Sequence, residues 1–248
     1  MIEVVDFHKS YGDVVAVSGL SFRVEPGQIV GLVGRNGAGK TTTFRALSGV
    51  IPPTLGRLAI NGFDLHQSPV EAKRSFAYVP DTPPLFDLLT VWEHLEFVAA
   101  AYQVQDFQSR AEDLLEQFEL TDRRDTVAQE LSRGMRQKVG ICCGYLHRPP
   151  VMLFDEPLTG LDPQAIRILK NSIIDYADQG VAIMISSHLL SLVEDVCTDL
   201  LILSDGRERF CGPLKQLHRH ALELGVQASL EDVFFHLTEK PQTAEAGR

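Results

Sequence analysis

Residues 34–41 read Gly-Arg-Asn-Gly-Ala-Gly-Lys-Thr and match the phosphate-binding pattern G-x-x-x-x-G-K-[ST] at every fixed position. Glycines allow backbone N–H groups to close around anionic oxygens, and the N-terminus of a following helix adds a partial positive charge. We expect Lys40 to contact the β- and γ-phosphates, Thr41 to place its hydroxyl on Mg²⁺, and Thr42 to donate a further hydrogen bond. The alternative is a glycine-rich turn with an incidental lysine. The other loop residues expected to contact phosphate are Gly34, Arg35, Asn36, Gly37, Ala38 and Gly39.

Two adjacent carboxylates, Asp155 and Glu156, end the apolar run 151–154. A buried strand of an open α/β sheet presents the residues at its carboxyl end to a ligand. We therefore expect Asp155 to hold Mg²⁺ and Glu156 to polarise an attacking water as a general base. Without the phosphate loop upstream, the same pair could equally mark a solvated strand boundary.

The elements that must position these residues can be expected from short apolar runs, turn signals and caps. An α/β core is interrupted by a mostly helical insert over about residues 84–148, which starts near the capping box of Thr90 and Glu93. Asp162 and Pro163 are an N-cap and first helical residue, and 204–206 is a hairpin turn. Strands are expected over 2–7, 14–24, 29–33, 57–60, 76–79, 151–155, 181–186 and 200–203, and further helices over 40–49, 106–118, 135–146 and 229–237.

Composition disfavours several classes of protein. The net charge is -10 and the pI about 5.2, and Lys and Arg are scattered, which disfavours nucleic acid as the principal partner. The four cysteines show no C-x-x-C spacing, so we expect small core thiols in a reducing compartment and no metal centre. We find no signal-peptide pattern and no run near the roughly twenty apolar residues that span a bilayer. A cytosolic chain is expected, with any membrane role exerted through a partner.

Further motifs, in their order and spacing, resemble those of the ATP-binding cassette (ABC) ATPases. Residues 131–137, Leu-Ser-Arg-Gly-Met-Arg-Gln, are similar to the family signature Leu-Ser-Gly-Gly-Gln. Residues 158–162 are similar to the D-loop, and 186–188, Ser-Ser-His, to the segment with the switch histidine. Tyr11, before Gly12, is similar to the aromatic residue that stacks on adenine, although a half-buried strand aromatic is the alternative.

The resemblance covers about residues 1–215 and implies a P-loop NTPase core. Its mixed or parallel sheet would be flanked by helices, with an N-terminal antiparallel β subdomain and the inserted helical subdomain. We expect the cassette domain to span 1–220, followed over 221–248 by a short helix and a polar tail. ATP and Mg²⁺ are the implied ligands, and ATP hydrolysis is the implied activity.

The resemblance also implies a dimer. Ser132 and the backbone of Gly134 would contact the γ-phosphate bound by a second cassette, either an identical chain or a paralogue. Two ATP molecules would join the pair head to tail, and hydrolysis would release it. A serine and glycine just before a helix suit this role, because a helix N-terminus binds anions. His188 would contact the γ-phosphate and couple nucleotide state to closure.

Two residues depart from the family pattern. Arg133 replaces the first glycine of the signature, and we expect function to be retained. Asp81 stands where the family usually carries the Q-loop glutamine, and exporter-type members carry glutamate there. We expect Asp81 to reach Mg²⁺, directly or through water.

Taken together, the sequence predicts the ATP-hydrolysing subunit of a transporter, peripheral on the cytoplasmic side of the membrane and bound to a separate permease. The apolar segment 83–89 could receive a permease helix, or its residues could pack inside the helical insert. Residues 230–237 resemble the end of bacterial export-type cassettes, which favours export. The alternative is a soluble cassette that acts on ribosomes or nucleic acid, which a single acidic cassette disfavours. The transported substrate leaves no signal in the chain.

Overall fold

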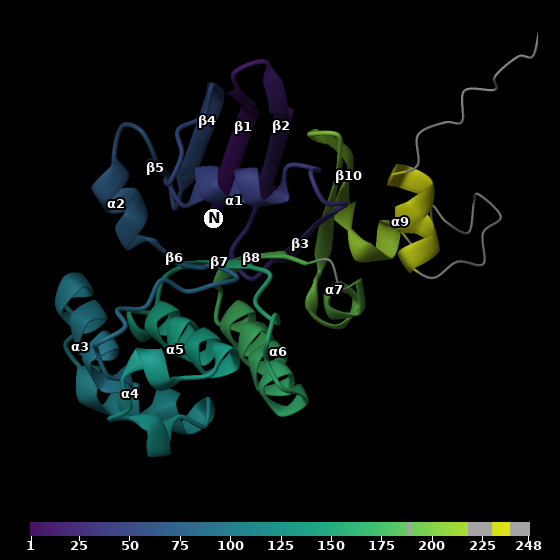
Figure 1. Cartoon of the computed structure of the whole chain (residues 1–248). Coiled ribbons are helices and arrows are strands. Elements are labelled where there is room, and N and C mark those ends of the chain that lie inside the picture. Colours follow the sequence, from purple (N-terminus) through teal and green to yellow (C-terminus); the bar gives the residue numbers. More distant parts are fainter. Residues whose placement is uncertain (188–189, 218–229, 239–248) are drawn as a thin grey trace, which may run out of the picture.

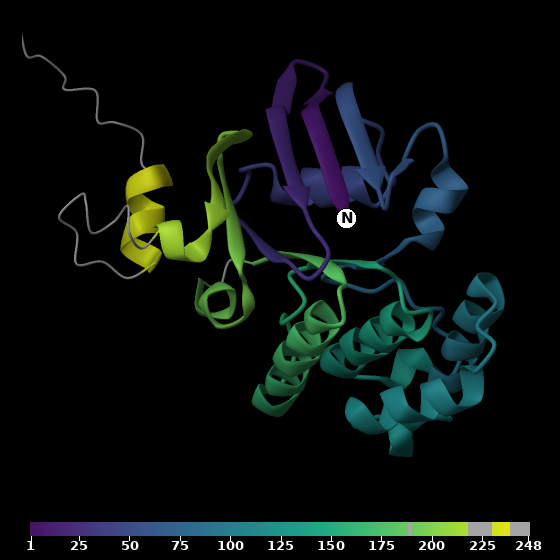
Figure 2. The ribbon, with the colours of Figure 1, turned by 180° about the vertical axis from the view of Figure 1, so that it is seen from behind.

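The computed structural model describes residues 1–187, 190–217 and 230–238. A six-stranded sheet lies through the middle of the molecule. An antiparallel sheet and helix α1 (Lys40–Leu47) cover one face, and helices α3 to α6 cover the other (Figure 1). The view from behind shows the same layers (Figure 2). Helix α9 (Leu230–Thr238) lies at the edge formed by β9 and β10.

Strand pairing divides the chain into two sheets, as expected. The first is antiparallel with the order β2-β1-β4-β5, and the second has the order β10-β9-β3-β8-β7-β6. Five neighbouring strands of the second sheet are parallel, and β10 runs antiparallel to β9. The strands are β1 (Ile2–Tyr11), β2 (Val14–Val24), β3 (Ile29–Gly34), β4 (Leu55–Ile60), β5 (Phe63–Asp64), β6 (Phe76–Val79), β7 (Val151–Asp155), β8 (Ala182–Ser186), β9 (Asp199–Ser204) and β10 (Arg207–Pro213).

The parallel strands separate two hydrophobic cores because successive side chains point to opposite faces of a sheet. Along β7, Val151 and Leu153 pack with α1 and the antiparallel sheet, whereas Met152 and Phe154 pack with the helical layer. Each large side chain buried in this way contributes about 1.5–3 kcal/mol. The further helices are α2 (Pro69–Arg74), α3 (Val91–Tyr102), α4 (Phe107–Gln117), α5 (Arg133–Leu146), α6 (Pro163–Asp178) and α7 (Leu190–Val196), with 3₁₀ turns at Thr121–Arg123 and Ala128–Glu130.

Side-chain caps fix the starts of three helices. Thr90 accepts a hydrogen bond from the backbone of Glu93 at 3.2 Å, and the Glu93 carboxylate accepts one from the Thr90 backbone at 2.7 Å, so the predicted capping box is present. Asp162 accepts from the N–H of Ala165 at 2.9 Å at the start of α6. Each such cap contributes about 1 kcal/mol. The third cap, Ser132, belongs to the candidate site.

The structure also contains elements that the sequence did not indicate. Helices α2 and α7 are only 6 and 7 residues long, which is too short for a helical period to stand out. Strand β10 has an exposed, polar pattern and exists through its pairing with β9. The helix expected over 229–237 is α9, which also includes Thr238, where the sequence predicts the start of the polar tail; the rest of that tail lies outside the described residues.

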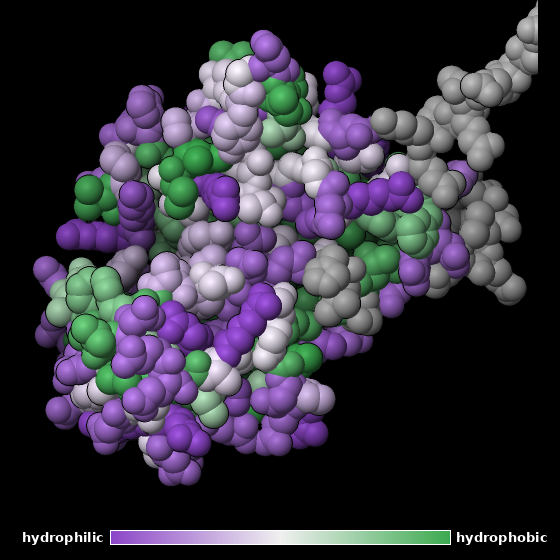
Figure 3. Space-filling model, viewed as in Figure 1, coloured by the Kyte–Doolittle hydropathy of each residue, from purple (hydrophilic) through white to green (hydrophobic). Residues whose placement is uncertain are grey.

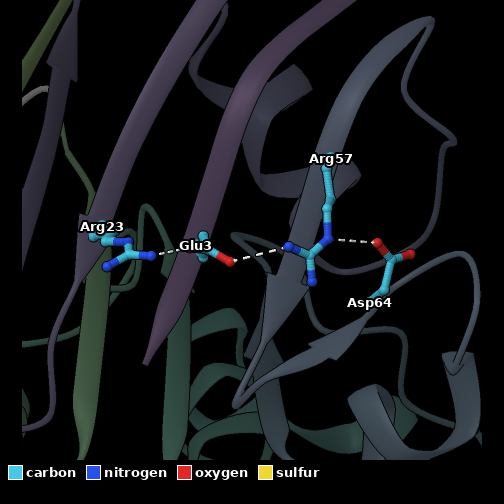
Figure 4. A network of polar contacts seen from close by, with 4 residues as sticks. All are labelled: Glu3, Arg23, Arg57 and Asp64. Carbon is cyan, nitrogen blue, oxygen red and sulfur yellow. Dashed lines mark hydrogen bonds and ion pairs between the residues drawn. The ribbon is translucent and has the colours of Figure 1, made fainter.

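Charged side chains join the strands on the outer face of the antiparallel sheet (Figure 4). Glu3 on the central strand accepts from Arg23 and from Arg57, whose Nε also donates to Asp64 at 3.0 Å. Glu3 lies directly opposite Arg23 in the register of β1 and β2. Opposite charges in facing positions favour this register, although each exposed pair contributes at most about 1 kcal/mol. Within the described ranges, no helix is long and apolar enough to cross a membrane.

Candidate nucleotide-binding site

The candidate site forms where four neighbouring parallel strands end. The order β3-β8-β7-β6 places the ends of these strands at one edge of the sheet. The phosphate loop follows β3, Ser186 ends β8, Asp155 ends β7, and Pro80 with Asp81 follows β6. Ligands of open α/β sheets bind at this edge. The topology therefore brings together residues that are widely separated in the sequence.

The phosphate loop is held in its curved shape by backbone contacts. Gly39, the N-cap of α1, has a φ of 105°, and a Cβ there would lie 2.8 Å from the carbonyl oxygen of Ala16 on β2. Only glycine fits such a position. The N–H of Gly206 donates to the Ala38 oxygen at 3.2 Å, and Ser18 donates to the Gly206 oxygen at 2.8 Å. The β9–β10 turn and β2 thus support the loop from outside.

The side chain of Lys40 folds back onto the phosphate loop. Its Nζ donates to the carbonyl oxygen of Gly34 at 2.7 Å, and the residue is 9% exposed. Burial lowers the pKa of Lys40, while the charges of Glu156 and Asp155 act in the opposite direction. Thr41, the next residue, is exposed on the first turn of α1. An ammonium group held by carbonyl oxygen alone can transfer to phosphate oxygens, which carry more charge.

Asp155 is 5% exposed, and the groups around it have opposite effects on the pKa of its carboxyl group. Ser186 donates a hydrogen bond to one carboxylate oxygen, and the Tyr78 hydroxyl donates to the other at 3.3 Å. Burial raises the pKa of Asp155, and the charges of Glu156 and Asp81 raise it further, whereas the two hydroxyl groups lower it. A buried carboxylate with acidic neighbours is stabilised by a cation. Asp155 therefore has the environment expected of a metal ligand.

Glu156 has an unusual backbone conformation. Its φ is 52°, in the left-handed region that residues other than glycine seldom occupy. Its N–H donates to both the hydroxyl oxygen of Ser186, at 3.0 Å, and the carbonyl oxygen of Ser186, at 3.2 Å. Such strain persists where the surroundings enforce it, commonly at functional sites. Ser186 therefore contacts both the carboxylate of Asp155 and the backbone of Glu156.

Ser186 and Tyr78 are the site residues that motif reasoning missed as individual contributors. Each belongs to a recognised segment, but no spacing rule ties either residue to Asp155. Ser186 is fully buried and lies in register with Asp155 across the β7–β8 pair. The only sequence signal was that both residues lie in predicted strands that end at the same edge.

The signature segment lies against the D-loop of the same chain. Ser132 is the exposed N-cap of α5 and accepts a hydrogen bond from the N–H of Met135 at 3.3 Å. A Cβ on Gly134 would lie 2.5 Å from the oxygen of Gly160, so the two backbones are in close contact. The aliphatic part of the Arg133 side chain packs against Gly160: a Cβ added to Gly160 would lie 3.2 Å from both Cγ and Cδ of Arg133. The arginine side chain therefore extends along the D-loop.

Tyr11, Asp81 and His188 are the other site residues named from the sequence motifs. Tyr11 ends β1 and is 48% exposed, with Lys9 Nζ 5.1 Å from its ring centroid, which fits both the expected adenine contact and the alternative of a half-buried strand aromatic. Asp81 is exposed, and its charge contributes to the raised pKa of Asp155. His188 lies outside the described residues.

A separate cavity of about 450 Å³ opens between the end of α1 and strands β4 and β5. It is lined by residues of the segments 46–58 and 64–67, among them Ile51, Leu58 and Leu65. None of its lining residues belongs to the phosphate loop or the ends of β6, β7 and β8. The cavity is therefore not part of the candidate nucleotide site.

A parallel sheet that ends in a phosphate loop, a buried aspartate and a neighbouring glutamate defines a P-loop nucleoside triphosphatase. Within this class, the inserted helices and the segment that resembles the signature are typical of one family. Residues 17–159 match the ABC transporter family. The chain belongs to this family and is an ATP-binding, ATP-hydrolysing subunit.

ATP-binding proteins of ABC transporters are similar to this chain in sequence and in structure over most of its length. The ABC-type transporter ATP-binding protein EcsA of Bacillus subtilis is 35% identical over 97% of both chains. The lipopolysaccharide export system ATP-binding protein LptB of Haemophilus influenzae is 35% identical, over 80% of this chain and 85% of its own. A solved structure of an ATP-binding subunit of an ABC transporter superimposes with a TM-score of 0.90 at 36% identity, over 96% of this chain and 100% of that one. The predicted α/β fold and ATPase class are thus confirmed.

Proposed function

We propose that this chain powers export through a separate membrane permease, from the cytoplasmic side of the membrane. Export is the stated activity of the system to which LptB belongs, and LptB shares 35% identity with this chain. The observation that carries the proposal is the convergence of Lys40, Asp155 and Glu156 at one sheet edge, in a chain whose residues 131–137 resemble the family signature. The ribosome or nucleic-acid alternative finds no support among these relatives, which are transporter ATP-binding proteins.

The residues present suit Mg²⁺ bound together with ATP. Thr41 offers a hydroxyl, and Asp155 and Asp81 offer carboxylates, which are the oxygen ligands that Mg²⁺ prefers. Across the described part of the chain, no three His, Cys, Asp or Glu side chains are grouped to hold a metal unaided. This agrees with an ion that takes the rest of its ligands from phosphates and water. When bound, the ion would neutralise charge on the phosphates.

Each side chain of the site has its own role in ATP binding and hydrolysis. The loop N–H groups and Lys40 bind the β- and γ-phosphates, with Lys40 exchanging the Gly34 oxygen for phosphate oxygens. Glu156 accepts a proton from the attacking water, and Ser186 holds the Glu156 backbone in place. His188 contacts the γ-phosphate, and Tyr11 stacks on the adenine. Arg35, Asn36, Gly37, Ala38, Gly39, Thr41 and Thr42 complete the phosphate contacts.

The fold favours a nucleotide shared between two cassettes. Helix α1, which begins at the phosphate loop, packs in the core on one face of the parallel sheet through Phe44 and Leu47. Helix α5, which begins at the signature segment, packs in the core on the other face through Val139 and Tyr145. Ser132 and Gly134 are therefore proposed to meet the phosphate loop of a second cassette, either an identical chain or a paralogue. ATP would hold this pair together, and hydrolysis would release it.

An apolar surface on the helical subdomain suits a permease. Phe86, Leu88 and Phe97 are 53%, 78% and 55% exposed. The rings of Phe86 and Phe97 meet edge to face with centroids 5.4 Å apart, and the Phe86 N–H donates to His94 Nε2 at 2.9 Å. Hydrophobic side chains gather over α3 at the lower left of Figure 3. By contrast, Leu85 packs against the core. The segment 83–89 thus divides between internal packing and an exposed face.

Recovery of partners from detergent-solubilised native membranes tests this proposal. Tagged wild-type protein should recover a polytopic membrane protein, and the double variant Phe86→Ser/Leu88→Ser should lose it while keeping its own ATPase activity. Phe63→Ser, at 39% exposed on β5, is the surface control and should retain the partner. Recovery of ribosomal or DNA-bound proteins in place of a membrane protein would overturn the transport proposal.

A further inference from the structure

Helix α9 is anchored to the ATPase core by one face and presents an aromatic ring on another. Leu230, Val233 and Phe234 are buried, at spacings that place them on one side of a helix. They pack in the core that also holds residues of β9 and α7. Phe235 is not part of this buried set and is 39% exposed. Packing in the hydrophobic core therefore does not explain why an aromatic ring stands at position 235.

The ring of Phe235 faces the side chain of Arg35, a residue of the phosphate loop. The guanidinium carbon of Arg35 is 5.7 Å from the centroid of the ring, within the range of a cation–π contact. No described carboxylate lies within 4 Å of the Arg35 guanidinium. The backbone of the same residue is built into the loop, because the Arg35 oxygen accepts from the N–H of Ala38 at 3.0 Å and lies 3.5 Å from Lys40 Nζ.

Helix α9 also contacts a second segment of the nucleotide machinery. It packs against α7, which begins two residues after His188. The helix therefore approaches the Arg35 side chain of the predicted phosphate loop and contacts the helix that follows the predicted switch residue. The α7 contact belongs to the buried face of α9, whereas the contact between Phe235 and Arg35 lies outside that face. This favours a role for α9 that goes beyond closing the core.

We propose that Phe235 is a positioning residue for ATP binding. The ring holds the long Arg35 side chain outside the curve of the phosphate loop, so that the loop is already open and ordered when ATP arrives. Removal of the ring frees this side chain to adopt many conformations, some of which fold over the phosphate position. Ordering it again on binding then weakens affinity. The inference rests on ATP binding alone and does not depend on the direction of transport.

Calorimetric titration of ATP into the full chain, combined with steady-state ATPase assays, tests the proposal. Phe235→Leu, which keeps an apolar side chain but removes the ring, should raise the Kd and KM for ATP by about 2- to 5-fold with kcat unchanged. Phe235→Tyr should keep wild-type values because its ring is retained. Phe63→Leu, a change at an equally exposed phenylalanine on β5, should also leave the Kd unchanged.

A double-mutant cycle separates the Arg35 contact from a general loss of structure. In an Arg35→Gln background, Phe235→Leu should have no further effect on the Kd, since its partner is gone. An equal effect in both backgrounds would overturn the proposal, and so would an unchanged or lower Kd in Phe235→Leu alone. If the leucine variant unfolds, Phe235→Tyr decides, because a Kd raised in the folded tyrosine variant contradicts a role for the ring.

Discussion

Replacement of Ser186 by alanine should weaken the binding of Mg²⁺ and ATP, an effect that a general loss of stability would not explain. The hydroxyl of this fully buried residue donates to Asp155 and accepts from the N–H of Glu156 at 3.0 Å. Ser186→Ala removes both bonds without adding bulk. The Glu156 N–H keeps the Ser186 carbonyl oxygen at 3.2 Å as an acceptor, so the main loss falls on the carboxylate of Asp155.

The size of the effect follows from the charge on Asp155. A hydrogen bond to a charged group contributes about 1.5–3 kcal/mol, and about 1.4 kcal/mol corresponds to a tenfold change in affinity. Tyr78 still donates to the second carboxylate oxygen at 3.3 Å, which places the expected loss near the lower limit. Because the Asp155 carboxylate is then no longer held in one orientation by Ser186, we expect the affinity for Mg²⁺ in the presence of ATP to fall by about tenfold.

The pH dependence of activity gives a second, independent readout. Burial raises the pKa of Asp155, and the Ser186 hydroxyl opposes this by stabilising the ionised form. Without the hydroxyl, the pKa of Asp155 rises further. The ionised form that suits Mg²⁺ is then lost at a higher pH as the solution is acidified. The acid limb of the ATPase profile should therefore move up by about one pH unit, the equivalent of a tenfold effect.

Ser172→Ala is the matched control, because Ser172 is a buried serine (1% exposed) on α6 whose hydroxyl pairs with Tyr145 at 3.0 Å. Both variants should lower the Tm by a few degrees, since each loses a buried hydrogen bond. Only Ser186→Ala should change Mg²⁺ affinity and the acid limb of the profile. The reasoning is refuted if Ser186→Ala has wild-type Mg²⁺ affinity and pH profile, or if Ser172→Ala shifts them equally.

Four further variants test other parts of the structure. Glu156→Gln should keep ATP binding, slow hydrolysis by at least about a hundredfold and trap an ATP-dependent dimer; wild-type turnover would contradict its role as general base. Lys40→Ala should raise the Kd for ATP by more than about tenfold, and an unchanged Kd in calorimetry would count against the phosphate-loop contact. Gly134→Ala places a Cβ 2.5 Å from the Gly160 oxygen, so light scattering should show loss of the ATP-dependent dimer while monomers still bind ATP. Thr90→Ala removes half of a capping box and should lower the free energy of unfolding by about 1 kcal/mol; an unchanged denaturant midpoint would show that this cap is dispensable.

Local signals identified the chemistry of this protein before its structure. The phosphate loop is a run of eight contiguous residues, so its backbone shape and its lysine follow from sequence alone. The caps at Thr90 and Asp162 are equally local, since each depends on residues within three positions. The alternation of short apolar runs with helical patterns was sufficient for the α/β class, because each element must bury one face.

Contacts between distant segments could not be found in this way. The bond from Gly206 to Ala38 joins a hairpin turn to the phosphate loop, and no periodicity links them. The contact between Arg35 and Phe235 spans most of the chain. Short elements such as α7 are stabilised by packing rather than by their own propensity, which explains why their sequences carry a weak signal.

The sequence by itself indicated which groups could bind phosphate and which carboxylates could act, because these properties depend on residue type and near-neighbour spacing. Only the tertiary structure decided how those groups meet. The strand order β3-β8-β7-β6 inserts β8 between the loop strand and the strand of Asp155, which makes Ser186 the partner of both the Asp155 carboxylate and the Glu156 backbone N–H. Strand order is set by the packing of helices on the two faces of a sheet. That packing is a property of the whole chain, and no single segment encodes it.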